Sequence, residues 1–174
     1  AYRDTYYRDR ATGGGAVQDA LTHIVDAAEW LVGPVGRVVA DVAHLALPDV
    51  EVEDTVHALA RHGDVLASYS LNQHQAPNET TITVACEKGT ARIEFHRQLW
   101  KSMAEPESPW VEHPIDLPSR DSLFVAQAKQ FLEAVAGRRE PACTILEGWQ
   151  TLRVNRALLA AAHHNAWQTV APPG

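Results

Sequence analysis

The 174-residue sequence has few cysteines, no long hydrophobic run and no excess of positive charge. Its two cysteines, Cys86 and Cys143, lack C-x-x-C or zinc-type spacing, and no signal-peptide pattern is present, which together indicate a reducing cytoplasm. Because no run of about 18 uncharged apolar residues occurs, no membrane-spanning segment is expected. The formal net charge of -7, with 15 scattered Lys and Arg residues, disfavours binding to nucleic acid. A small or weakly charged ligand is therefore expected.

The sequence also lacks an initiator Met, and we interpret it as a fragment of a longer protein. Its length and its 45% hydrophobic content are sufficient for one hydrophobic core. We therefore expect residues 1–174 to form a single domain.

The most informative stretch is a glycine run, Gly13-Gly14-Gly15, followed by an amphipathic helix predicted over residues 17–32. Apolar residues recur along the helix every three or four positions: Val17, Leu21, Ile24, Ala28 and Leu31. The opposite side carries two carboxylates, an imidazole and an indole: Asp19, His23, Asp26 and Trp30. A helix that only covers a core usually presents Lys and Glu four residues apart on its outer side. This composition is instead typical of a functional site.

Strand and helix patterns fill the rest of the chain. We predict strands over residues 2–10, 37–47, 55–61, 65–73, 80–87, 90–95 and 167–170. Residues 99–118 contain four prolines and are predicted to be mostly loop, with a short strand near 111–117. Two further helices are predicted over residues 121–136 and 144–164, the second opened by a Thr144 to Glu147 capping box, with Leu152, Leu159 and Ala162 facing inward.

These elements predict an α+β fold with an open-faced, largely antiparallel β-sheet and helices packed on one face. The strand at residues 37–47 is apolar on both sides, because Val38, Ala40 and Val42 alternate with Val39, Ala43 and Leu45. A bare apolar sheet face usually marks an interface. We therefore expect a homo-oligomer that pairs through the exposed face of the sheet.

The pattern G-G-G-x-x-x-D-x-L-x-H-x-x-D-x-x-x-W-L-V-G resembles the C-terminal domain of the Gfo/Idh/MocA oxidoreductases. This is the family of glucose-fructose oxidoreductase and inositol dehydrogenase. Val52-Glu53-Asp54-Thr55, Gly63 and Lys88-Gly89 continue the similarity, which covers nearly the whole chain. The helix is its most specific part.

The resemblance implies a function. Members of the family have an N-terminal Rossmann domain that binds NAD or NADP, and they oxidise or reduce a hydroxyl or carbonyl carbon of sugars, polyols and related compounds. Their second domain makes the dimer or tetramer contacts. The family's catalytic Asp and His match Asp19 and His23. No G-x-G-x-x-G fingerprint occurs in this chain, so it is expected to hold no cofactor and to be inactive without the N-terminal domain.

The chemistry fits the spacing independently. A neutral imidazole with an ordinary pKa near 6.5 can accept the hydroxyl proton as a hydride leaves the carbinol carbon. Arg10 and Asp26 are candidate substrate-binding residues. Arg10 could instead pair with Asp9 or face solvent, and Asp26 could instead form structural hydrogen bonds. His163 and His164, adjacent on a helix, cannot both point toward one ion, so no metal site is expected there.

Three functions are compatible with the sequence. The first is the substrate and oligomerisation domain of a nicotinamide-dependent oxidoreductase. The second is a binding or assembly module, derived from the same domain, that catalyses nothing. The third is a metal-dependent lyase or hydrolase that uses Asp19, His23 and a third ligand such as Asp26.

Overall fold

The computed structural model describes residues 6–171, which divide into two compact units. Unit 1 comprises residues 6–74 and 143–171 of this range, and unit 2 comprises residues 75–142. Unit 1 contains η2 (Arg10–Thr12), η3 (Val17–Leu21), α1 (Thr22–Val32), β1 (Arg37–Ala43), β2 (Thr55–His62), β3 (Val65–Asn72), α3 (Ile145–His164) and β8 (Gln168–Thr169). Unit 2 contains β4 (Thr81–Cys86), β5 (Gly89–Glu94), η4 (Phe95–Arg97), β6 (Leu99–Met103), β7 (Val111–Pro114) and α2 (Arg120–Val135).

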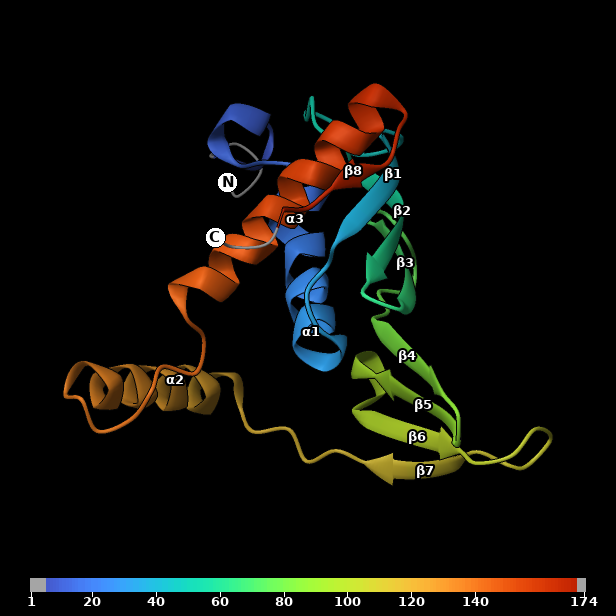
Figure 1. Cartoon of the computed structure of the whole chain (residues 1–174), viewed down its shortest axis with the longest axis vertical. Coiled ribbons are helices and arrows are strands. Elements are labelled where there is room, and N and C mark those ends of the chain that lie inside the picture. The colour runs from blue at the N-terminus through green and yellow to red at the C-terminus, as the bar shows by residue number, and fades with distance from the viewer. Residues whose placement is uncertain (1–5, 172–174) are drawn as a thin grey trace. The chain divides into compact units, whose positions relative to one another are not determined.

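Unit 1 is a four-stranded antiparallel sheet with strand order β3-β2-β1-β8. Helices α1 and α3 lie along the same side of this sheet (Figure 1). Their buried side chains form one core with the inward residues of the strands: Ala16, Val17, Leu21, Val25, Val35, Val38, Ala40, Val56, Ala58, Ala60, Tyr69, Val154, Leu158, Ala161 and Val170. The predicted α+β class, with helices covering one face of an antiparallel sheet, is confirmed.

The other face of the unit 1 sheet is open. Leu59 and Leu66, on β2 and β3, are 53% and 71% exposed, whereas Val38 and Val56 on the inward side are fully buried. This alternation follows from the two-residue period of a strand. The predicted strand at 37–47 ends at Ala43, so Leu45 lies in the loop beyond it and is exposed.

The last helix, α3, begins at the predicted capping box. The Thr144 hydroxyl accepts a hydrogen bond from the Glu147 N–H, and the Glu147 carboxylate accepts one from the Thr144 N–H. The predicted inward face is wrong at Leu152, which is exposed, because the residues that contact β1 and α1 are Val154, Leu158 and Ala161.

The strand predicted over residues 2–10 is wrong in its described part, and residues 2–5 lie outside the described residues. Tyr6 and Tyr7 lie in a helical turn, and η2 follows from Arg10. Tyr7 is buried in a small cluster with Leu47, Val50 and Val52, so its aromatic ring serves packing rather than a sheet. The Thr12 hydroxyl donates to the Tyr6 and Asp9 carbonyl oxygens and closes the turn.

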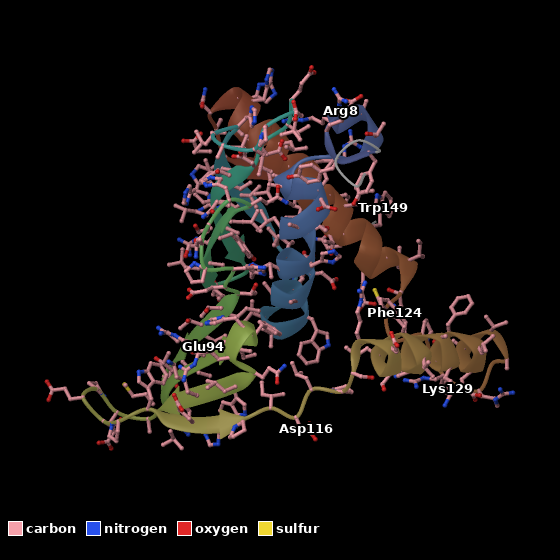
Figure 2. All side chains as sticks on the ribbon, turned by 180° about the vertical axis from the view of Figure 1, so that it is seen from behind. Arg8, Glu94, Asp116, Phe124, Lys129 and Trp149 are labelled. Carbon is pink, nitrogen blue, oxygen red and sulfur yellow. The ribbon has the colours of Figure 1, made fainter. Side chains whose placement is uncertain are left out.

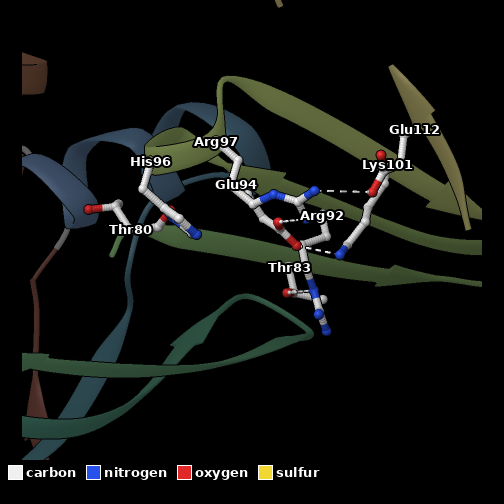
Figure 3. Close-up of polar contacts among 8 residues, drawn as sticks. All are labelled: Thr80, Thr83, Arg92, Glu94, His96, Arg97, Lys101 and Glu112. Atoms are coloured by element: carbon white, nitrogen blue, oxygen red, sulfur yellow. Dashed lines mark hydrogen bonds and ion pairs between the residues drawn. The ribbon is translucent and has the colours of Figure 1, made fainter. Parts of the chain in front are cut away.

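Unit 2 is a second antiparallel sheet with strand order β4-β5-β6-β7. We predicted loop where β6 lies, because four prolines dominate residues 99–118, but all four follow β6 or end β7. The buried Glu94 carboxylate is bonded to Lys101 and to Arg97, the latter at 2.9 Å, and Arg97 also lies 3.6 Å from Glu112 (Figure 3).

Helix α2 in unit 2 begins and ends close to the prediction, within one residue at each end. Its large apolar side chains, including the labelled Phe124 in Figure 2, are all exposed: Leu123, Phe124, Val125, Phe131, Leu132 and Val135. None of the helices in residues 6–171 is both long and apolar enough to cross a membrane.

Candidate functional site

The candidate site is built around the start of the helix that carries Asp19 and His23. Gly13 and Gly15 have φ angles of +90° and +104°, which favour glycine. A Cβ atom on Gly14 would lie 2.1 Å from the Tyr7 carbonyl oxygen, and one on Gly15 would lie 2.5 Å from Glu53 Oε1. Gly14 and Gly15 are therefore required by close approaches of other chain segments, whereas Gly13 is favoured by its positive φ alone.

Glu53 reaches this helix start from the turn that precedes β2. Its carbonyl oxygen accepts a hydrogen bond from the Ala16 N–H at 2.9 Å, and its Oε1 accepts one from the Val17 N–H at 3.1 Å. Its Oε2 lies 2.7 Å from the Arg10 guanidinium. The Glu53 side chain is only 2% exposed, whereas that of Arg10 is 51% exposed.

The neighbouring carboxylate of Asp54 supports the loop that follows β1. Burial acts to raise the pKa of Asp54, but hydrogen bonds from the backbone N–H groups of Leu47, Ala46 and Leu45 and from the Thr55 hydroxyl outweigh it. The pKa of Asp54 therefore lies well below its usual range. Two consecutive acidic residues thus hold two different segments in place.

Asp19 lies in the first, wider turn of the helix. Residues Val17–Leu21 form a π-helical turn, after which the α-helical pattern of α1 begins. A π turn holds more residues than an α turn, and such turns are frequent at functional sites. The Tyr6 hydroxyl donates a hydrogen bond to Asp19 Oδ1 at 2.5 Å. Asp19 is half-buried.

His23 and Asp26 follow on the outer side of α1. Both are exposed, and the Thr151 hydroxyl on α3 lies 3.5 Å from Asp26 Oδ1. Trp30, at the far end of the same side, is 84% exposed. An exposed imidazole one turn from a half-buried carboxylate can exchange a proton with a ligand hydroxyl group, and the carboxylate can accept a hydrogen bond from it.

The predicted inner stripe is correct except at its last residue. Val17 and Leu21 are buried and Ile24 and Ala28 pack against the core, whereas Leu31 is exposed. Val25, which was not in the predicted stripe, is also buried in the core. Polar contacts join α1 to α3: Glu29 accepts hydrogen bonds from Gln150 at 2.8 Å and from the Thr151 hydroxyl at 2.9 Å. These contacts attach the C-terminal half of α1 to α3.

The structure brings some predicted residues together and separates others. Arg10 lies beside the helix start but is bonded to Glu53 rather than to Asp9. Among residues 6–171, no three His, Cys, Asp or Glu side chains could together hold a metal ion, so the metal-dependent alternative has no ligand set there. A shallow depression of about 630 Å³ lies on the open sheet face, and none of its described lining residues belongs to α1.

Sequence reasoning missed Tyr6 and Glu53 as parts of the site. The sequence pattern predicts a strand at Tyr6 and includes Glu53 only in a motif that the family shares. A signal for Glu53 existed in Gly14-Gly15, because adjacent glycines at a helix start indicate that another group approaches closely. The sequence does not identify which group that is.

Comparison with known proteins identifies the family. The model of the GFO/IDH/MocA C-terminal domain matches residues 1–92, more than half of the chain. The chain therefore belongs to the GFO/IDH/MocA C-terminal domain family. No protein with a curated description matches it.

Solved structures agree with this assignment. Levoglucosan dehydrogenase in complex with NADH superposes with a TM-score of 0.83 at 18% identity, over 97% of this chain and 54% of that one. The WlbA dehydrogenase from Bordetella pertussis, in complex with NADH and UDP-GlcNAcA, gives a TM-score of 0.72 at 27% identity, over 99% and 51%. An oxidoreductase domain protein from Kribbella flavida gives 0.82 at 20% identity, over 96% and 53%. The chain thus spans about half the length of these proteins.

Proposed function

We propose that this chain is the substrate-side domain of an NAD(P)-dependent oxidoreductase that acts on a sugar, a polyol or a related hydroxyl compound in the cytoplasm. NAD or NADP would be bound mainly by a Rossmann domain N-terminal to this chain. The observation that carries the proposal is the helix that presents Asp19 and exposed His23 one turn apart, with its start held by Glu53.

The comparisons support the reaction class. Structures similar to this chain include dehydrogenases that hold NADH, one with UDP-GlcNAcA and one with levoglucosan. The chain's own sequence contains no dinucleotide fingerprint. The N-terminal Rossmann domain would therefore bind the cofactor, and this domain would supply the groups that bind the substrate and accept its proton.

His23 is proposed as the general base. A bound nicotinamide ring would exchange a hydride with the carbinol carbon. In the oxidation direction, the neutral His23 imidazole takes the hydroxyl proton, so that the carbon–oxygen bond becomes a carbonyl as the hydride departs. The Asp19 carboxylate orients the imidazole or the substrate hydroxyl. Arg10 and Asp26, on either side of this pair in sequence, would bind other oxygen atoms of the substrate.

The test is His23→Ala in the full-length protein. We expect kcat to fall about a hundredfold or more, while the KM for the nicotinamide cofactor stays nearly unchanged, because the base acts only in the chemical step. His163→Ala is the matched control, since His163 is also an exposed helical histidine, on α3. Normal turnover by His23→Ala would remove this residue from the mechanism and would favour a non-catalytic assembly module.

The open sheet face is proposed as the interface of a homo-oligomer. Exposed Leu59 and Leu66 share this face with Val39, His57 and the serines of β3. Sedimentation of the wild type should therefore detect a dimer or larger assembly, and Leu59→Asp should dissociate it because it buries a charge in the interface. Leu123→Asp, an equally exposed leucine on α2, should leave the assembly unchanged. A wild-type monomer at high micromolar concentration would contradict this part.

A further inference from the structure

We infer that Glu53 is the positioning residue of the Asp19–His23 pair, acting through the backbone at the helix start. The inference rests on the proposed function for the role of that pair. Glu53 lies outside the helix, and no residue within the helix caps its start with a side chain.

The helix has no local cap that could do this. Ala16 occupies the N-cap position and has no side-chain oxygen, so it makes no side-chain hydrogen bond to the first turn. Helix N-termini need acceptors for their free N–H groups, and Ser, Thr, Asp or Asn usually provides one from the N-cap itself. Here the acceptors are the carbonyl oxygen and Oε1 of Glu53, 2.9 Å from the Ala16 nitrogen and 3.1 Å from the Val17 nitrogen.

The position of the Glu53 carboxylate is itself fixed from two sides. Arg10 holds Oε2 at 2.7 Å. Gly15 leaves the space that the carboxylate occupies, since a Cβ atom there would lie within 2.5 to 2.8 Å of all three carboxylate atoms. A side chain that is almost fully buried, bonded to Arg10 and to the Val17 N–H, and packed against Gly15 has little freedom to move.

This fixed acceptor lies at the residue where the π turn begins. Val17, whose N–H is held, is the first residue of the π turn, and Asp19 follows two positions later. Loss of the Val17 hydrogen bond would leave the start of this turn without its acceptor, and we expect the turn that carries Asp19 then to shift relative to His23. A displacement of reacting groups by about 1 Å can cost on the order of a hundredfold in rate.

The test uses Glu53→Ala and Glu53→Gln in the full-length protein. The glutamine keeps an amide oxygen for the Val17 N–H but loses the charge that pairs with Arg10. We expect Glu53→Ala to lower kcat about tenfold to a hundredfold, with the KM for the nicotinamide cofactor nearly unchanged. Glu53→Gln should keep kcat within about threefold of the wild type. If Glu53→Ala does not fold, Glu53→Asp serves in its place, because its carboxylate is one methylene too short to reach Val17.

Glu29→Ala is the matched control for general loss of helix stability. Glu29 is a carboxylate at the opposite end of the same helix, where it accepts hydrogen bonds from the Val35 N–H and from Gln150. Its removal should lower stability without lowering kcat. An equal loss of kcat in Glu29→Ala and Glu53→Ala would overturn the inference, as would equal kcat values in Glu53→Ala and Glu53→Gln.

A second measurement separates this inference from the proposed function. Hydrogen exchange of the Val17 amide should be faster in Glu53→Ala than in Glu53→Gln, whatever reaction the protein catalyses. Unchanged exchange would overturn the positioning role. Normal turnover by His23→Ala, with faster Val17 exchange in Glu53→Ala, would instead defeat the proposed function and leave the structural role of Glu53 intact.

Discussion

The hydroxyl group of Tyr69 lies 2.7 Å from Nε2 of His62 within the core of unit 1. The other ring nitrogen of His62, Nδ1, lies 2.6 Å from the carbonyl oxygen of Gly33, the residue that ends α1. Because a carbonyl oxygen only accepts, Nδ1 carries a proton, and in the tautomer protonated at Nδ1 alone Nε2 accepts from the Tyr69 hydroxyl. This chain of hydrogen bonds ties the end of the site helix to β2 and β3.

Removing the Tyr69 hydroxyl should destabilise unit 1. Tyr69→Phe leaves the Nε2 atom of buried His62 without a donor, so we expect the free energy of unfolding to fall by about 1–2 kcal/mol. Urea denaturation measures the change. Ser68→Ala, at the adjacent exposed position of β3, should have little effect and is the control. Equal stability of wild type and Tyr69→Phe would mean that this hydrogen bond contributes nothing.

The same tyrosine should make the protein sensitive to high pH. Burial, together with the negative charge of Glu29, raises the pKa of Tyr69 well above its ordinary value near 10. The folded state therefore disfavours the ionised phenol, and stability is lost as pH rises above about 10 toward the folded-state pKa. Tyr69→Phe should reduce this alkaline loss in denaturation measured between pH 8 and 11. If the free energy of unfolding falls equally steeply with pH in Tyr69→Phe and in the wild type, other groups cause the alkaline loss of stability.

Asp54 should give the opposite pH dependence. Its pKa is lowered in the folded state, so its contribution is present above the ordinary carboxyl pKa of about 3.9 and is lost as pH falls below that value. Asp54→Asn should cost about 2–4 kcal/mol at pH 7, because each buried donor left without an acceptor costs about 1–3 kcal/mol. The difference in the free energy of unfolding between Asp54→Asn and the wild type should become smaller below about pH 4. Asp64→Asn, an exposed turn residue, should show neither effect.

Two acidic residues of unit 2 test the effect of burial on an ion pair. Glu94 is bonded to Lys101 and Arg97 while buried, and Glu133 is bonded to Arg138 at 2.5 and 2.7 Å with its side chain 45% exposed. Glu94→Gln should lower the melting temperature by several degrees, because it leaves Lys101 partly uncompensated. Glu133→Gln should change it little, since solvent screens that pair. Equal decreases in melting temperature for the two variants, measured by calorimetry, would contradict this effect of burial.

Local patterns predicted most of the elements. Helix α1 ends at Val32 as predicted, just before Gly33-Pro34, and the Thr144 capping box opens α3. Gly63 lies between the predicted strands of one hairpin, and Gly89 begins the second strand of another. Each of these signals acts over a few residues, so the sequence alone contains the needed information. The α+β class followed from the same elements.

Features that depend on contacts between distant segments were not predictable in this way. Tyrosine is common in strands, so the sequence favours a strand at Tyr7. In the structure Tyr7 lies in a helical turn and packs against Leu47 and Val52, which are distant in sequence. The division into two four-stranded sheets depends on which strands pair with each other, and the hydrophobic periodicity within a strand does not indicate its partner. Asp19 and His23 were proposed from the family pattern and their catalytic role stays a prediction, whereas Glu53 became visible only in three dimensions.

The distance along the chain between the helix start and its acceptor has a consequence for biosynthesis. Val17 and Glu53 are separated by 36 residues, and Glu53 leaves the ribosome later. A nascent chain that stops short of the β2 strand can form helical turns at residues 17–32, but their first N–H groups have only water as a partner. The geometry of the helix start is therefore completed late in synthesis, after the segment that carries Asp19 and His23 has been made.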